Sequence, residues 1–378
     1  MRLLFVTDNG FSSKGKDFYY SGANVQHYAT ATKFFDEIVF VARNSKYDPS
    51  ASLISPKYKT YLIDSITSGR HVFRSYSELN RILEMEIKNA DAVMCFGLNG
   101  YLAFRKAKRY GKPTIAFIGG CVYETLTNMD SVPKRMLAPV MMELIRDMAK
   151  NSDYVHYVAD FLFDRYPTDH KYLICSDAAI EIDDRVIQKR TEKIMESKNE
   201  PKMVGIIGYT HNRIKGIDTA IRALSMLGEE YRLQIVGRGD NAWLHRIACE
   251  LKIEHRIEFL GVLNGRSEIF DWLDSIDIYL QPSLTEGMPR ATLEAMSRGC
   301  PVITTSVGGL KALIDEEDRI AVGDYETLAY KLDVLGKDKD LLLSKAIRNF
   351  KEAKSYESVR LDKKRDSFYS TIVEDLRC

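Results

Sequence analysis

Two glutamates stand in the most informative stretch of the 378-residue sequence, which reads EGMPRATLEAMSRGCPVITTSVGG. Glu286 precedes a Gly-x-Pro turn. Glu294 follows in a helical pattern over residues 291–298, with Pro289 well placed in the first turn. The N–H groups at the start of a helix attract a phosphate, and carboxylates beside them accept hydrogen bonds from sugar hydroxyls. A ligand that carries both kinds of group is a nucleotide sugar.

The same stretch resembles the signature of the retaining glycosyltransferases of family 4, the group 1 glycosyltransferases. The residues that match it are Glu286, Gly287, Pro289, Glu294, Ala295, Met296, Gly299, Pro301, Val302, Gly308 and Gly309. Two glutamates at this spacing occur by chance in charged helices, whereas the composite string in this order is specific. The resemblance implies the GT-B fold, in which two Rossmann-like domains face a cleft. A surface helix with two solvated glutamates is the alternative interpretation.

A second candidate is the loop GYTHNRIKG at residues 208–216, between a predicted strand and a predicted helix. Arg213 and Lys215 are close enough together in it for both cations to reach one diphosphate. The family carries an Arg just after the first glycine of this loop and a Lys just before the last. Lys215 matches the Lys, whereas Tyr209 stands in the Arg position and the loop is longer than usual. We expect Lys215 and Arg213 to act on the diphosphate, with solvated loop cations as the alternative.

Three further positions complete the expected donor site. Gly22 is the retained glycine of the Gly-Gly-Ala that the family carries before its first helix, expected here at 23–35, with an ordinary helix-entry residue as the alternative. Val262, after another strand, is the nucleobase contact that the resemblance implies, and a buried strand end without a ligand is the alternative. Gly237 opens the segment GRGDNA at 237–242, which fits the dinucleotide fingerprint. An NAD-dependent oxidoreductase is therefore a rival interpretation, although the family carries a similar Val-Gly-x-Gly here.

The acceptor side of the site is less defined. Many family members carry a histidine at the ends of the fourth and fifth strands, but here these ends read CFGL and IGGC. His27 and His156 fall elsewhere, and a lone histidine is more often structural than catalytic. Glu124 is a weak candidate, so the general base is left unassigned. The loop after the first strand is expected to touch the acceptor through Lys14, Lys16, Tyr19 and Tyr20.

Short β-branched runs alternate with amphipathic segments along the chain, a pattern typical of parallel sheets covered on both faces. Strands are expected at residues 3–7, 38–42, 60–63, 92–96, 114–118, 154–158, 172–175, 204–207, 232–236, 257–260, 278–280, 302–304 and 320–322. Helices are expected at 23–35, 77–88, 101–110, 134–150, 161–166, 217–227, 242–251, 266–275, 291–298 and 325–335, with two more in the tail. The fold class is therefore α/β, with two doubly wound domains.

The charged segment 181–202 interrupts this rhythm and ends in Pro201, and a helix within residues 185–197 is one interpretation of its middle part. We expect an acceptor-side domain at 1–180, a linker at 181–202, a donor domain at 203–356 and a helix at 357–378 that returns to the first domain. Ligands of open α/β sheets bind at the carboxyl ends of the strands. Two such edges would then hold one substrate each.

The composition is that of an ordinary globular protein, with 45% apolar and 28% charged residues. The net charge of +1 argues against a nucleic-acid partner, and no apolar run is long enough to span a membrane. The strand that begins at Arg2 leaves no room for a secretory signal. Six scattered cysteines favour a reducing cytoplasm. Seven histidines without a metal-binding pair predict no dedicated metal site, although a divalent ion carried in by a phosphate ligand remains an alternative. No cofactor is expected.

Residues 133–150 form a basic amphipathic segment that combines Met136, Val140 and Met148 with Lys134 and Arg135. Such a helix either packs on a core with its charged face solvated, or docks peripherally on the inner face of an anionic membrane. The first interpretation is more common and is preferred here, but both remain open.

The combined prediction is a retaining glycosyltransferase that moves a sugar from an NDP-sugar, with UDP or GDP favoured, to the hydroxyl of a sugar or lipid-linked acceptor. Polysaccharide, lipid-linked oligosaccharide or glycoconjugate synthesis is the implied setting. Glu294 would bind the ribose and Glu286 the transferred sugar. Backbone around Met288, Pro289 and Arg290 would assist the loop cations at the leaving diphosphate. A noncatalytic subunit that binds sugar nucleotides remains an alternative, as does the oxidoreductase.

Overall fold

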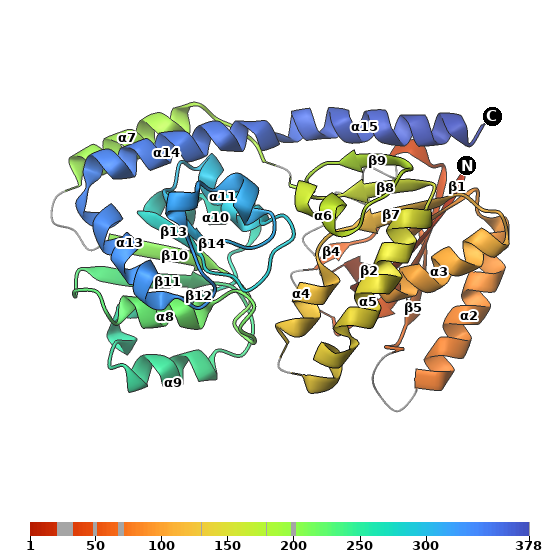
Figure 1. Ribbon diagram of the computed structural model, residues 1–378, viewed down its shortest axis with the longest axis horizontal. Helices are drawn as coiled ribbons and strands as arrows, with labels where there is room; N and C mark the ends of the chain where they lie inside the picture. The colour runs from red at the N-terminus through yellow and green to blue at the C-terminus, as the bar shows by residue number, and fades with distance from the viewer. Residues whose placement is uncertain are drawn as a thin grey trace. The chain divides into compact units, whose positions relative to one another are not determined.

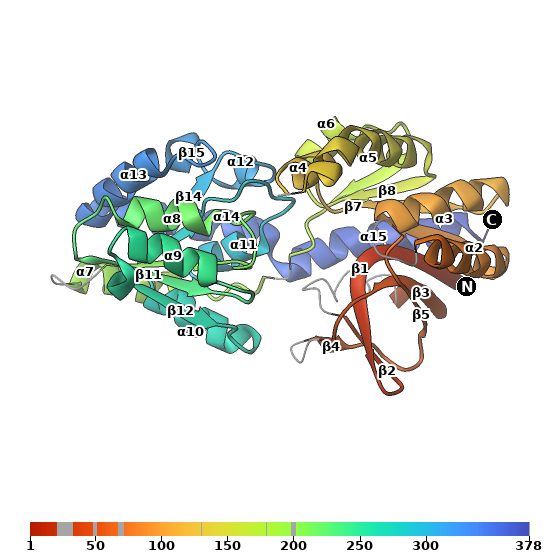
Figure 2. The same cartoon turned by 90° about the horizontal axis from the view of Figure 1, so that it is seen from below.

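The computed structural model describes residues 1–20, 33–47, 51–66, 72–129, 131–178, 180–197 and 202–377. The chain forms two compact units, each shown in Figures 1 and 2. Unit 1 comprises Met1–Tyr123, Leu137–Asp177 and Leu361–Cys378, and unit 2 comprises Glu124–Met136 and Ala178–Arg360. Each unit is built on its own largely parallel sheet, as the alternating pattern predicts. Gly22, His27 and most of the expected first helix lie outside the described residues.

Unit 1 contains a nine-stranded sheet within the described residues. Its strands are β1 (Arg2–Lys14), β2 (Asp17–Tyr20), β3 (Glu37–Asn44), β4 (Ser52–Leu53), β5 (Lys59–Ile63), β6 (Ala92–Phe96), β7 (Thr114–Ile118), β8 (Tyr154–Tyr157) and β9 (Lys171–Ile174). Seven of them run parallel in the order β5-β3-β1-β6-β7-β8-β9. The strands β2 and β4 add an antiparallel flap beside the end of β1.

The start of this sheet corrects one expectation. The predicted acceptor loop is a β-hairpin, because β1 continues to Lys14 and β2 carries Tyr19 and Tyr20. Phe11 and Tyr20 face each other across the hairpin with ring centroids 5.0 Å apart, and both are buried. This aromatic pair extends the strand beyond the short apolar run that signals it in the sequence.

The helices of the first half are α2 (Val72–Asn89), α3 (Gly97–Arg109), α4 (Val122–Thr127), α5 (Val132–Asn151) and α6 (Asp160–Arg165). The C-terminal helix α15 (Ser358–Asp375) returns to unit 1 over residues 361–378, as predicted. It lies on the face of the sheet opposite α2 and α3 (Figure 1). There Tyr369 and Ile372 pack in one buried cluster with Leu3 and Phe5, the alternate residues of β1 that point to this face.

Unit 2 contains a six-stranded parallel sheet in the order β12-β11-β10-β13-β14-β15. Its strands are β10 (Lys202–Ile207), β11 (Tyr231–Val236), β12 (Ile257–Gly261), β13 (Ile278–Gln281), β14 (Val302–Thr305) and β15 (Arg319–Ile320). The chain winds outward from β10 to β12 and then crosses back to β13 on the other side of β10. The point between β10 and β13 is the topological switch point, where sheets of this kind bind ligands.

The helices of the second half are α7 (Arg185–Glu196), α8 (Ile217–Leu224), α9 (Ala242–Glu250), α10 (Gly265–Ser275), α11 (Arg290–Ser297), α12 (Leu310–Leu313), α13 (Tyr325–Lys337) and α14 (Lys339–Ala353), with short 3₁₀ turns at Glu254–Arg256, Glu316–Asp318 and Lys354–Tyr356. The helices α8 and α9 lie on one side of the sheet and α10 and α11 on the other (Figure 1).

The expected linker contains α7, which matches the helix considered within residues 185–197, and α7 belongs to unit 2. The buried Arg190 explains why this charged helix packs there. Its guanidinium donates to the backbone oxygen atoms of Ile276, Leu273 and Arg298, at 2.6, 2.7 and 3.2 Å. Three carbonyl groups thus accept hydrogen bonds from the buried Arg190 cation. In the sequence this arginine cannot be distinguished from the solvated charges around it.

Ile372→Ala is expected to destabilise unit 1 by about 2–5 kcal/mol, because it leaves a cavity under α15. Hydrogen exchange of β1 and β6 peptides measures this loss. Both tryptophans, Trp243 and Trp272, lie in unit 2, so the tryptophan fluorescence transition should stay in place. Val359→Ala on the same helix is the control, since Val359 is 60% exposed. Unchanged exchange of β1 in the Ile372 variant would contradict the packing of α15.

Candidate functional site

An ion pair joins the two sides of the switch point in unit 2. Lys215 Nζ lies 2.7 Å from Glu286 Oε1. Lys215 ends the loop between β10 and α8, and Glu286 lies in the loop between β13 and α11, while β10 and β13 are paired neighbours. The structure therefore brings together one predicted loop cation and one predicted carboxylate at the carboxyl edge of the sheet.

Close backbone contact holds these two loops together. Gly216, which follows Lys215, has a φ of 65°, and a Cβ at this position would lie 1.9 Å from the backbone oxygen of Pro282. Ile214 accepts a 2.8 Å backbone hydrogen bond from Leu284 in the opposite loop. Only glycine combines this left-handed conformation with so close an approach, so the glycine that ends the loop sets the distance between the two charges.

Glu286 is 8% exposed, yet its Oε1 is well supplied with donors. Besides Lys215, it accepts hydrogen bonds from Ser283 Oγ at 2.7 Å and from Gln281 Nε2 at 3.0 Å. Sequence reasoning missed Gln281 and Ser283. The sequence does carry a signal for them. Every second residue from Tyr279 onward is polar in an otherwise apolar strand, so these side chains share one face of it.

Glu294 lies about one turn inside α11 and is partly exposed. Burial raises the pKa of its carboxyl group, while Arg290 and Arg266 act to lower it. No described side chain or backbone group donates a hydrogen bond to this carboxylate, so its acceptor capacity is available to a ligand. This position suits the hydroxyl-binding role that the sequence suggests.

Arg213 does not join the ion pair. Its Nε and Nη2 lie 3.1 and 2.9 Å from Asp218 Oδ2 on α8, and its guanidinium lies 5.9 Å from the centroid of Trp243. The Arg213 side chain is 53% exposed, whereas that of Asp218 is largely buried. Arg213 therefore neutralises a buried carboxylate of its own unit.

The other predicted donor contacts lie around the start of α11. Pro289 is the N-cap residue of that helix, where no side chain supplies a capping hydrogen bond, and Arg290 is its first residue. Met288 packs on a buried cluster of unit 2, and Gly309 donates a 3.0 Å backbone hydrogen bond to the oxygen of Gly287. The start of the helix is thus braced by backbone contacts and retains N–H groups that can bind an anion.

Gly237 and Val262 follow the neighbouring strands β11 and β12. Gly237 donates a 2.7 Å backbone hydrogen bond to Gly261, and a Cβ on it would lie 1.8 Å from the oxygen of Gly208. Gly237, the first glycine of the apparent dinucleotide fingerprint, therefore allows the ends of neighbouring strands to pack closely. Val262 is 43% exposed, as a contact for a ligand requires.

In unit 1, the backbone N–H groups at the start of α3 bond a carboxylate of the same unit. The Asp8 carboxylate, at the end of the apolar part of β1, accepts backbone hydrogen bonds from Leu98 at 2.5 Å and Asn99 at 3.1 Å. It therefore occupies the N-terminal end of α3, where a phosphate would otherwise find free N–H groups. Burial raises the pKa of Asp8, against the lowering effect of these bonds.

His156 is a structural residue. It is buried, with Nδ1 3.3 Å from the Tyr369 hydroxyl of α15 and Nε2 3.1 Å from the backbone oxygen of Cys175. Glu124, the other weak candidate, accepts a 3.2 Å hydrogen bond from Thr285, the neighbour of Glu286.

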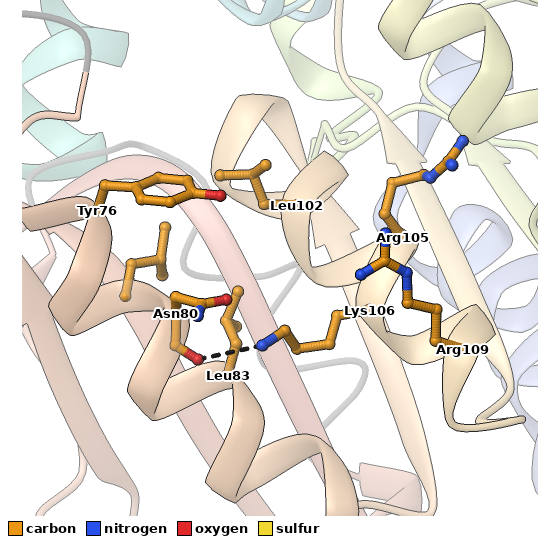
Figure 3. A pocket seen from close by; sticks show the side chains of 8 residues that line it. Tyr76, Asn80, Leu83, Leu102, Arg105, Lys106 and Arg109 are labelled. Carbon is orange, nitrogen blue, oxygen red and sulfur yellow. Dashed lines mark hydrogen bonds between the residues drawn. The ribbon is translucent and has the colours of Figure 1, made fainter. Parts of the chain in front are cut away.

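A pocket of about 120 Å³ lies between α2 and α3 of unit 1 (Figure 3). It is lined by Tyr76, Leu79, Asn80, Leu83, Leu102, Arg105, Lys106 and Arg109. Figure 3 shows Lys106 turned toward Asn80, whose backbone oxygen accepts from Nζ at 3.3 Å, and Glu84 pairs with the same ammonium at 2.7 Å. None of the predicted site residues lies in this pocket.

One group of carboxylates in unit 2 has the spacing of metal ligands. Asp315, Glu317 and Asp318 form the one acidic cluster found among the described residues, and the Lys345 ammonium pairs with Glu317 and lies 2.7 Å from Asp318. A lysine thus supplies the positive charge there.

No helix in the described part of the chain is both long and apolar enough to cross a bilayer.

Comparison with known proteins bears on the family and the fold of this chain. Residues 201–338 match the family model "Glycosyl transferases group 1". Protein CapJ of Staphylococcus aureus is 25% identical over 391 aligned positions, which cover 99% of this chain and 97% of CapJ. The UDP-Gal:alpha-D-GlcNAc-diphosphoundecaprenol alpha-1,3-galactosyltransferase of Escherichia coli is 32% identical over 146 residues, or 37% of each chain.

Among solved structures, HepE of Anabaena in complex with UDP-glucose has a TM-score of 0.70 at 15% identity, and the match covers 98% of this chain and 100% of HepE. The similarity extends over both units of this chain, which confirms the predicted fold class. With the match of residues 201–338 to the family model, these findings support a group 1 glycosyltransferase with a GT-B-like fold.

Proposed function

We propose that this enzyme transfers a sugar from a nucleoside diphosphate sugar to an acceptor hydroxyl, with retention of the anomeric configuration. The observation that carries the proposal is the Lys215–Glu286 pair at the switch point of unit 2, with Glu294 on the adjoining helix. One cation and two carboxylates within this short stretch of the sheet edge match a ligand that combines a diphosphate with two polyols. UDP-Gal in the name of the Escherichia coli relative, and UDP-glucose in the HepE complex, favour a UDP-sugar over a GDP-sugar.

Lys215 has the central electrostatic role in this proposal. When the bond between the anomeric carbon and the diphosphate breaks, its electron pair leaves with the diphosphate oxygen. Lys215 and the N–H groups at the start of α11 stabilise that charge, each charge-assisted contact contributing about 1.5–3 kcal/mol. The acceptor oxygen forms the new bond, and its proton passes to the departing phosphate or to water. Electrostatic stabilisation of this kind needs no protein nucleophile.

Each of the two carboxylates binds one of the two polyols of the donor. Glu286 binds hydroxyls of the transferred sugar and stabilises the positive charge that develops at its anomeric carbon. Glu294 accepts hydrogen bonds from the ribose. Val262, Gly237 and Gly22 remain predicted donor contacts. Asp218 holds Nε and Nη2 of Arg213 and partly neutralises its charge, so the contribution of Arg213 at the diphosphate should be smaller than that of Lys215.

We further propose a lipid-linked or polysaccharide acceptor, since the Escherichia coli relative is named for a diphosphoundecaprenol substrate. The first half of α5 supports contact with an anionic membrane. Val132, Met136 and Val140 are 57%, 76% and 53% exposed, and Lys134 and Arg135 beside them are exposed as well. Apolar side chains with adjacent cations suit the headgroup region of such a surface.

A cytoplasmic location at the inner face of that membrane completes the proposal. The five described cysteines are all free thiols, which fits a reducing compartment. The family assignment removes the oxidoreductase interpretation. The noncatalytic subunit is the remaining rival, and turnover by the isolated protein separates it from the enzyme.

The proposal is tested with a panel of UDP-, GDP- and ADP-sugars. One donor class should raise the melting temperature, because a ligand that binds only the folded state stabilises it, and the same class should be hydrolysed slowly or transferred. Lys215→Ala should then lower turnover by about 10- to 1000-fold, on the scale of losing one strong electrostatic contact. Lys351→Ala, an exposed lysine on α14, is the matched control. If no sugar nucleotide binds, or Lys215→Ala turns over at the wild-type rate, the proposal fails.

Glu294→Gln should weaken nucleoside diphosphate binding about tenfold by calorimetry while stabilising unit 2. Burial raises the Glu294 pKa above 4.5, so the folded state disfavours the carboxylate, and the penalty is complete above the raised pKa. The melting temperature of unit 2, followed by tryptophan fluorescence, should rise by about 1–3 °C at pH 8. This gain should shrink as the pH falls toward 4.5. Glu286→Gln should instead lower it, because Lys215 loses its partner. A lower melting temperature for Glu294→Gln at pH 8 would refute this account.

Membrane contact is tested by cosedimentation with phosphatidylglycerol and phosphatidylcholine vesicles. Replacing Met136 and Val140 by Ser should reduce binding to the anionic vesicles about tenfold, since two exposed apolar side chains are lost. Tyr330→Ser is the control, because Tyr330 is 70% exposed on α13. Equal binding of both variants, or no preference for the anionic lipid, would exclude a membrane role for α5.

A further inference from the structure

Three polar side chains lead from the interior of the unit 2 sheet to Glu286. Tyr279 and Gln281 are alternate residues of β13, and Ser283 follows two positions later. The Tyr279 hydroxyl donates to Gln281 Oε1 at 2.7 Å, and Gln281 Nε2 donates to Ser283 Oγ at 2.7 Å and to Glu286 Oε1 at 3.0 Å. Ser283 Oγ donates to the same Glu286 oxygen at 2.7 Å. All four side chains are buried, at 8% exposure or less.

We propose that Gln281, held in place by Tyr279, is a positioning residue that presents Glu286 to the transferred sugar. The inference rests on the proposed function, in which Glu286 contacts that sugar. Neither Gln281 nor Tyr279 would touch the substrate. Their effect passes through the orientation of one carboxylate.

Tyr279 determines which way the Gln281 amide points. Its hydroxyl donates to the amide oxygen, so the NH₂ group must face Ser283 and Glu286. A reversed amide would place its oxygen against the carboxylate and leave Ser283 without its donor. Tyr279 is fully buried, and burial raises the pKa of its hydroxyl well above the usual range, so the group remains protonated and able to donate.

This network treats the two oxygens of Glu286 differently. Oε1 accepts three hydrogen bonds, from Lys215, Gln281 and Ser283. Oε2 accepts no hydrogen bond from the described residues. One oxygen is anchored to the protein and the other can accept from a sugar hydroxyl.

The anchoring matters most when the donor is bound. A diphosphate competes for the Lys215 ammonium, and the carboxylate then loses its only charged partner among the described residues. Gln281 and Ser283 are neutral and are not drawn to the phosphate, so they continue to hold Oε1. Without them Glu286 would be free to rotate at the moment when positive charge develops on the sugar, and small displacements of such groups cost much of their effect.

The test compares Gln281→Leu and Tyr279→Phe with the wild type on a donor that the wild type turns over. Gln281→Leu should lower kcat about 10- to 100-fold with the donor KM changed less than about threefold, because Lys215 and Glu294 still bind the nucleotide. Tyr279→Phe should lower kcat about three- to tenfold, since the amide keeps its place but loses its fixed orientation.

Gln234 offers a matched control on the neighbouring strand β11. Its amide bonds Glu258 Oε2 and accepts from Trp272 Nε1, both at 2.9 Å, so Gln234→Leu removes a comparable network elsewhere in the sheet. Its kcat should stay within about twofold of the wild type. Tyr231→Phe provides the same control for the tyrosine, because the Tyr231 hydroxyl bonds only a backbone oxygen, that of Leu332, in the described structure.

Each result decides the matter. A wild-type kcat in Gln281→Leu overturns the positioning role. A decrease in kcat no larger than that of Gln234→Leu, or an increase in the donor KM as large as the decrease in kcat, overturns it as well. If Gln281→Leu melts far below the wild type, Tyr279→Phe, which removes one oxygen atom, decides instead. A wild type that turns over no sugar nucleotide overturns the proposed function itself, which is a different outcome from an unaffected variant of an active enzyme.

Discussion

The ion pair between Lys215 and Glu286 is the interaction on which the candidate site depends. It links two loops whose charged residues are 71 positions apart in the chain, and it does so at the switch point of a parallel sheet. A partly buried carboxylate costs free energy unless a cation and hydrogen-bond donors compensate it. Here the compensation comes from Lys215, Gln281 and Ser283, so the same contacts that make Glu286 tolerable in the folded state also orient it.

The two units treat anions in opposite ways. In unit 1, the N-terminal end of α3 already holds the Asp8 carboxylate. In unit 2, no side chain caps α11, and Lys215 lies at the edge of the same sheet. Both units use the parallel-sheet architecture, but of these two helix starts that of α3 is occupied by a carboxylate, whereas that of α11 lies at a sheet edge that also carries a cation. This difference gives a physical reason why the nucleotide should bind to unit 2, independent of any resemblance.

Much of the fold was predictable because buried parallel strands are short, apolar and bounded by turn residues. Strands β6 and β7 begin and end where the pattern predicts. The sequence was least informative where tertiary contacts determine the structure. The β1–β2 hairpin depends on Phe11 packing against Tyr20, and α7 is held in unit 2 by carbonyl groups that surround Arg190. Neither contact has a short-range signature.

The sequence by itself determined the strand and helix periodicity, the composite motif around Glu286 and Glu294, and the loop that carries two cations. Only the tertiary structure decided that Lys215 meets Glu286 while Arg213 turns to Asp218. It also showed that Gln281, an unremarked residue at a strand end, bonds the same carboxylate. The physical reason is that spacing along a chain fixes which side chains share a helix face or a strand face. Which loops become neighbours follows from the order of strands in the sheet, and that order is set by packing of the whole unit.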